Sequence, residues 1–290
     1  MGKGVKRTVT GGEVTTVVKT GSASRRMYKP KVTTKTKKEI KDAVYKELSK
    51  QLELKNCIND YSNVLINAPI PSGVVFNGAG NFFRLLPQIQ QSTTGQAGAA
   101  YNERVGNSIS LKHMDVHGFL SFNVAKIQEA SLVNAKLAVR VMILRAKEIN
   151  DTGILFDNMP TDKLIRFGFD SGTGGASTYN AGNLDSFREI NRDAFAVRYD
   201  QVHYLNAPVI TPGTTGGEDL ALIPSGLKMF KTRLSFGRGL KLNYSDAGDT
   251  LPNNFPYFMV IGYSSMGDAG PPANGLVRCT VSCTGQYTDA

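Results

Sequence analysis

The sequence predicts an all-β protein: an eight-stranded antiparallel jelly-roll sandwich preceded by a basic disordered arm and one short amphipathic helix. Three observations predict it. Cationic residues crowd the first 38 positions, a period of four follows, and a period of two then runs through eight segments separated by loops rich in Gly, Pro, Asn and Ser. About eight antiparallel strands with long loops are typical of a double-sheet jelly roll. We therefore expect an arm at 1–38, a helix at 39–55 and a β domain at 56–290.

The arm carries the whole net charge of the chain. Residues 1–38 hold eleven basic residues and one acid, Glu13, whereas the remaining residues hold 23 of each sign, so the +10 of the 290-residue chain lies in the arm. Low hydrophobicity with net charge predicts disorder. Scattered cations neutralise phosphates without reading base sequence, which predicts nucleic-acid binding. The predicted nucleic-acid-binding residues are Lys3, Lys6, Arg7, Lys19, Arg25, Arg26, Lys29, Lys31, Lys35, Lys37 and Lys38.

Other roles for the arm stay open at this point. A solvated solubility tail and an anionic membrane surface are the alternatives to nucleic acid. Arg25 with Arg26, or Lys35 with Lys37 and Lys38, are short clusters of the kind that nuclear import machinery reads.

The helix is predicted from apolar residues that recur at every fourth position. They are Ile40, Val44, Leu48 and Leu52. Thr36 and Glu39 have the spacing of a capping box, which would mark the start of the helix. A lone helix of this length is marginal in water, so we expect its apolar stripe to pack on the body or on a neighbouring subunit.

The strand candidates show alternating or continuous apolar runs. They lie near 61–68, 82–89, 107–123, 134–147, 193–204, 227–244, 255–264 and 275–285. Between Leu111 and Met114 the apolar parity switches, which predicts a β-bulge. Arg140 and Arg145 lie in an apolar strand, where an unpaired buried charge is costly. We expect Arg140 to bind carboxylates or loop carbonyls on the outer face of its sheet or at an interface.

Two stretches carry a resemblance to a known family. Residues 102–112 contain Arg104, Gly106, Ile109 and Leu111 in the pattern R-x-G-x-x-I-x-L, and residues 230–257 contain a Lys-flanked strand, a Gly/Asp loop and Asn-Asn-Phe-Pro-Tyr. Together with the arm, this resembles the single-jelly-roll capsid proteins of small icosahedral viruses, most closely those of circular, Rep-encoding single-stranded DNA viruses. The resemblance covers most of residues 30–287. The arm departs from the Arg-dense arms of many such proteins, since it contains only three arginines.

The resemblance implies a viral capsid protein in the virion that self-assembles into an icosahedral shell and packages a single-stranded DNA genome through its arm. The simplest such shell is a homo-oligomer of 60 copies with T=1 symmetry, assembled in the host nucleus or cytoplasm. The coat protein of a small RNA virus is an alternative, because a cationic arm binds either polymer. A non-viral jelly-roll binding module with a basic tail is the other. The host receptor is not predicted.

No enzyme, cofactor or metal is predicted, although several residue patterns are compatible with a metal or phosphate site. His113, Asp115 and His117 alternate along one strand and could gather around a metal, but we favour a polar strand face at a loop or interface as the explanation. Asp246 with Asp249, and Glu218 with Asp219, could bind Ca²⁺ or act as turn acids. Gly172–Gly175 does not lie between a strand and a helix, so it fails as a phosphate loop. We expect no catalytic residues.

Membrane insertion and disulfides are also not expected. No run of 18 apolar residues is present, and no apolar stretch follows the basic N-terminus as it would in a secretory signal. The three cysteines, Cys57, Cys279 and Cys283, have no paired spacing.

Overall fold

The computed structural model describes residues 34–51, 53–71, 80–92, 102–123, 125–126, 136–166, 176–207, 226–267 and 270–289. The chain divides into two compact units, residues 1–51 and 52–290. The described part of the first unit is helix α1 (Thr34–Gln51), and every strand that the structure describes lies in the second unit.

Helix α1 spans Thr34–Gln51, so both of its ends differ from the expected range of 39–55. It begins at Thr34, five residues before the expected start at 39, so Thr36 lies inside the helix and is not its cap. Lysine is a good helix former, and Lys35, Lys37 and Lys38 therefore continue the helix into the predicted arm. At the other end, strand β1 begins at Lys55, whose buried ammonium donates to the carbonyl of Glu103 and pairs with Asp289. These contacts hold residue 55 in the body.

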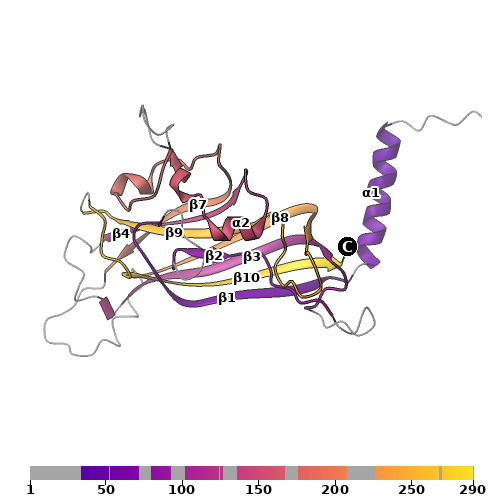
Figure 1. Ribbon diagram of the computed structural model, residues 1–290, viewed down its shortest axis with the longest axis horizontal. Helices are drawn as coiled ribbons and strands as arrows, with labels where there is room; N and C mark the ends of the chain where they lie inside the picture. Colours follow the sequence, from indigo (N-terminus) through magenta and orange to yellow (C-terminus); the bar gives the residue numbers. More distant parts are fainter. Residues whose placement is uncertain are drawn as a thin grey trace, which may run out of the picture. The chain divides into compact units, whose positions relative to one another are not determined.

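The second unit is a sandwich of two four-stranded antiparallel sheets (Figure 1). One sheet has the order β1-β10-β3-β8, and the other has the order β2-β9-β4-β7. Bounds in the first sheet are β1 Lys55–Ile66, β10 Val277–Asp289, β3 Ser108–Phe122 and β8 Leu227–Asn243. Bounds in the second are β2 Phe82–Arg84, β9 Tyr257–Ser265, β4 Lys136–Ala146 and β7 Phe195–Asn206.

This strand order is that of a jelly roll, and it confirms the predicted fold. Successive strands of the sandwich change sheets at every connection except the one from β4 to β7, which pair with each other. Each of the eight predicted segments overlaps one of these strands. Strand β9 is buried along its whole length, as its continuous apolar sequence predicts.

The two sheets differ in how their outer faces are covered. Segment 176–192 lies on the outer face of β9 and β4, where the Tyr179 hydroxyl bonds Ser186 at 3.0 Å and Ser186 bonds Ser264 at 2.6 Å. Gly262 permits this approach, because a Cβ there would lie 2.8 Å from Cε1 of Tyr179. Strands β3, β8 and β10 instead alternate between buried and more exposed residues. The outer face of the first sheet is therefore open to solvent along these strands.

The predicted β-bulge is confirmed in β3. Pairing with both neighbouring strands shifts between Leu111 and His113, which leaves Lys112 as the extra residue. The facing strand β8 accommodates the shift with residues 236–239, where Gly237 and Gly239 have φ of 59° and 114°. The Lys112 ammonium donates to the carbonyl of Arg238 at 3.1 Å.

Several short elements have no counterpart in the predicted elements. They are α2 (Thr152–Asp157), the 3₁₀ turns η3 (Thr161–Lys163) and η4 (Asn183–Ser186), and the two-residue strands β5 (Ile165–Arg166) and β6 (Ala176–Ser177). Asp151 caps α2 by accepting the N–H of Ile154. No helix within the described residues is both long enough and apolar enough to cross a membrane.

Candidate nucleic-acid interface

The structure places only three of the eleven predicted nucleic-acid-binding residues. Lys35, Lys37 and Lys38 lie in the first turns of α1 and are exposed. Eight lie outside the described residues: Lys3, Lys6, Arg7, Lys19, Arg25, Arg26, Lys29 and Lys31. The three placed lysines belong to a helix rather than to an irregular arm.

The start of α1 concentrates positive charge where the helix least favours it. At 3.6 residues per turn, Lys35, Lys37, Lys38 and the exposed Lys41 occupy roughly half of the helix circumference. The first turn holds no acidic residue. Cations at a helix N-terminus oppose the helix dipole, and a bound anion relieves that repulsion. Sequence reasoning missed Lys41, although its i+3 spacing from Lys38 could have indicated it.

His113, Asp115 and His117 lie on the outer face of β3. Asp115 forms an ion pair with Arg233 of the neighbouring strand β8. Asp115 accepts from Nε and Nη2 of Arg233 at 2.6 and 2.7 Å, and these bonds lower the pKa of the Asp115 carboxyl. Nε2 of His113 lies 3.7 Å from Asp115. Because Arg233 occupies both carboxylate oxygens, the polar strand face accounts for this trio. Across the described residues, no three His, Cys, Asp or Glu side chains gather as metal ligands would.

Asp246 and Asp249 are turn acids. Asp246 accepts the backbone N–H groups of Gly248 and Asp249, and Asp249 accepts those of Ser245 and Asp246. Their carboxylates are thus used to close the loop after β8. Glu218, Asp219 and the segment Gly172–Gly175 lie outside the described residues.

Arg104, the arginine of the R-x-G pattern, is fully buried beneath that loop. Its guanidinium lies 4.2 Å from the centre of the Tyr244 ring. It donates to the carbonyls of Gly106 and Asp246, each at 2.6 Å, and to that of Asp249 at 2.8 Å. It also donates to the carbonyl of Ile89 and to Oε1 of Gln91. Its role is therefore structural, because it joins three segments of the chain through their oxygen atoms.

Arg140 has the partners that its strand position predicted. Its guanidinium forms a bidentate salt bridge with the carboxylate of Asp200, with N–O distances of 2.7 and 2.8 Å. It also donates hydrogen bonds to the carbonyls of Asp185 and Arg188. It lies on the outer face of β4 beneath segment 176–192. Arg145 instead lies with its guanidinium 5.4 Å from the ring centre of Phe255.

The three cysteines are free thiols buried in the first sheet. Burial raises the pKa of Cys57 and of Cys283 to about 12, and it also raises that of Cys279. Because the thiolate is the reactive form, these residues are inert packing groups.

The fold places this chain in the class of jelly-roll sandwiches, and the comparisons with known proteins add little to that. No protein family model and no curated protein matches the chain. A solved structure described as "KBV activated particle at acidic pH" is similar over 81% of this chain and 71% of its own, at 11% identity and a TM-score of 0.30. A likeness of this degree carries no argument about function.

Proposed function

We propose that this protein is the capsid protein of a small icosahedral virus, and that it packages a single-stranded genome through its basic N-terminal segment. Two properties support the proposal. The body is a lone jelly roll with an electrically balanced composition, and residues 1–38 carry the entire net charge of +10. An enzymatic role is not proposed, because the motifs that could carry chemistry are either structural or outside the described residues.

The observation that supports the proposal most is that the net positive charge lies in the N-terminal segment and not in the β domain. A cationic segment attached to a neutral domain binds a polyanion while the domain remains free to contact other subunits. In a shell of 60 copies, the segments would supply about 600 positive charges, which offsets part of a genome of a few thousand phosphates. The lysines at the start of α1 extend this charge into an ordered helix.

We propose single-stranded DNA as the genome, with RNA as the alternative that the same charges would serve. The arm contains Tyr28 as its single aromatic residue, so base stacking by the arm contributes little. Binding by the arm is then electrostatic and indifferent to base sequence. Delivery of the protein to the nucleus through Arg25 with Arg26, or through the α1 lysines, is part of the DNA proposal.

The test is the salt dependence of binding by the full-length protein, measured by fluorescence anisotropy with poly-dT and mixed-sequence strands. If about six to eight of the eleven cations engage phosphate, the slope of log K against log salt is about −4 to −6. Replacing Lys35, Lys37 and Lys38 with Gln should flatten the slope by about two and weaken all strands alike.

The matched control replaces three lysines of the body, Lys147, Lys163 and Lys241, with Gln. This control should leave the slope within about one unit of the wild-type value. A slope near zero, or a hundredfold preference for one sequence, would show that the segment does not package a genome. Parallel titrations with DNA and RNA strands measure the preference between the two polymers.

A further inference from the structure

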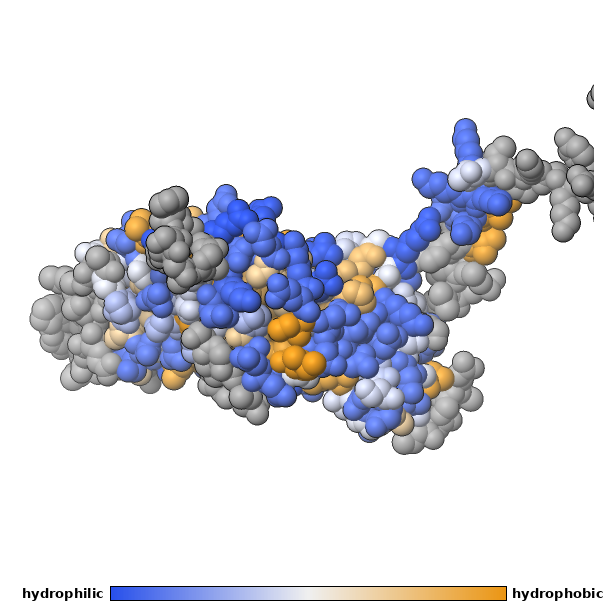
Figure 2. Space-filling view, turned by 45° about the horizontal axis from the view of Figure 1, so that its top comes forward, coloured by the Kyte–Doolittle hydropathy of each residue, from blue (hydrophilic) through white to orange (hydrophobic). Residues whose placement is uncertain are grey.

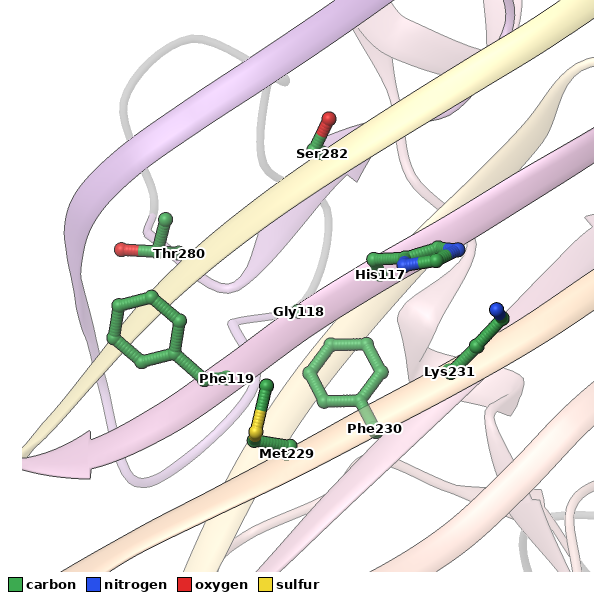
Figure 3. Close-up of a pocket in the computed structure, with 8 residues that line it drawn as sticks. All are labelled: His117, Gly118, Phe119, Met229, Phe230, Lys231, Thr280 and Ser282. Carbon is green, nitrogen blue, oxygen red and sulfur yellow. The ribbon is translucent and has the colours of Figure 1, made fainter.

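The open face of the first sheet carries a hollow formed by two rows of side chains. The pairing register places Phe119 of β3 between Met229 of β8 and Thr280 of β10. Two residues along the strand, His117 lies between Lys231 and Ser282. These six side chains line a hollow of about 400 Å³, in which one row is largely apolar and the other is cationic and polar (Figure 3).

The apolar row is exposed on a surface that is otherwise mainly polar. Met229 is 77% exposed, and Phe119 is partly exposed beside it. On the one face of the molecule that Figure 2 shows, the described surface of the body is largely hydrophilic, with apolar side chains in small patches. An aromatic ring beside a polarizable thioether offers a surface on which a planar ring can stack.

The cationic row lies at the distance that a nucleotide requires. Two residues along a strand span about 7 Å, which is comparable to the separation of a nucleobase from its own phosphate. His117 and Lys231 are exposed and face each other across β3 and β8. Asp60 of β1 continues this row beyond Ser282. Asp60 lies two strand spacings, about 10 Å, from His117. The positive end of the row is therefore at Lys231, on the side away from Asp60.

We propose that this hollow binds one nucleotide of a single-stranded nucleic acid. The base stacks on Phe119 and Met229, and the phosphate lies against Lys231 and His117. Charge complementarity selects this occupant, because the apolar row borders a cationic row. The inference rests on the proposed function and deepens it, since it adds a stacking site on the body to the electrostatic arm. It gives the genome a defined contact on the first sheet of the β domain.

The first experiment measures binding of fluorescent oligo-dT to the full-length protein at about 0.5 M salt, where contacts made by the arm are strongly weakened. Replacing Phe119 and Met229 together with Ala should weaken binding by about fivefold or more and leave the salt slope unchanged. Lys231→Gln should reduce the slope by about 0.7. The matched control is Ile58→Ala with Leu65→Ala, which removes exposed apolar side chains of β1 and should not change affinity.

The second experiment locates the contact directly by photo-crosslinking the wild-type protein to oligonucleotides that contain 5-iododeoxyuridine. We expect crosslinked peptides that include residues 117–119 or 229–231. Crosslinks confined to residues 1–51, with unchanged affinity in the Phe119/Met229 variant, would overturn the inference. So would a loss of self-association in that variant without any loss of affinity, because a second copy would then cover the face.

These outcomes separate the hollow from the proposed function. If the hollow fails but the proposed function holds, the protein still forms particles and still binds oligonucleotides with a steep salt slope. If the proposed function fails, the wild-type protein forms no particles and its salt slope is near zero.

Discussion

Arg104 shows how one buried residue connects parts of the chain that are far apart in sequence. Residues around position 90, positions 104–107 and the loop at 246–249 all supply oxygen atoms to its guanidinium. Backbone bonds from Arg104 to Gln90 and from Ser92 to Arg104 hold the same region together. The side chain of Arg104 is fully buried, so its guanidinium depends on these oxygen atoms rather than on water. A buried acceptor without a donor costs about 1–3 kcal/mol.

Arg104→Met should therefore lower the free energy of unfolding by about 3 kcal/mol or more, because several carbonyls lose their donor at once. Urea denaturation of the purified protein measures the change. Arg166→Met is the matched control, since Arg166 and its partner Asp193 are both exposed, at 49% and 81%. The control should change stability by at most about 1 kcal/mol. Equal stability of the two variants would contradict the structural role of Arg104.

Strands were predictable from sequence because their period reflects burial on one or both faces. The bulge at Lys112 was predictable for the same reason, since an extra residue reverses the apolar parity. The start of α1 was not predictable from the sequence, because lysines can continue a helix without adding to its apolar period. The elements between β4 and β7 were missed because tertiary contacts hold them, such as those of Tyr179 with Ser186 and of Arg140 with the carbonyl of Asp185.

The candidate site was predictable only in part. Clustering of charge singled out residues 1–38, of which the structure places the lysines of α1, and their binding to nucleic acid stays a prediction. The hollow on the open face depends on the register of three strands that are far apart in sequence, and no local pattern places Phe119 beside Met229 or His117 beside Lys231. The R-x-G pattern marked Arg104 by resemblance, but its burial under the loop at 246–249 depends on the folded chain.

At the scale of elements, the fit of β3 against β8 depends on Gly118. A Cβ at this position would lie 2.4 Å from Cζ of Phe230, whose ring is 5% exposed. Gly118→Ala should therefore destabilise the fold by about 1–3 kcal/mol through overpacking. Adding Phe230→Leu should recover part of that loss, because the smaller side chain vacates the space.

The control for this prediction is Gly106→Ala. A Cβ at Gly106 meets no atom within 4 Å, so stability should change by at most about 0.5 kcal/mol. Thermal unfolding of the four proteins measures the series. A double variant less stable than Gly118→Ala alone would contradict the packing of Phe230 over Gly118.

For the whole molecule, we propose that the jelly roll forms the contacts of assembly and that the N-terminal segment packages the genome. The two units make this division testable, because every strand among the described residues lies in residues 52–290. Deleting residues 1–33 removes eight of the eleven predicted cations and leaves the described body intact. We expect the truncated protein to remain folded and to form particles with a lower ratio of absorbance at 260 nm to that at 280 nm. An insoluble or unfolded product would contradict the division.

Closure of the jelly roll into a shell can be observed by negative-stain electron microscopy of the purified full-length protein. We predict uniform spherical particles of one diameter, because identical subunits related by closed symmetry form a shell of fixed size. A field of single subunits or small oligomers, under conditions in which the protein is folded and nucleic acid is present, would show that the protein does not form a shell.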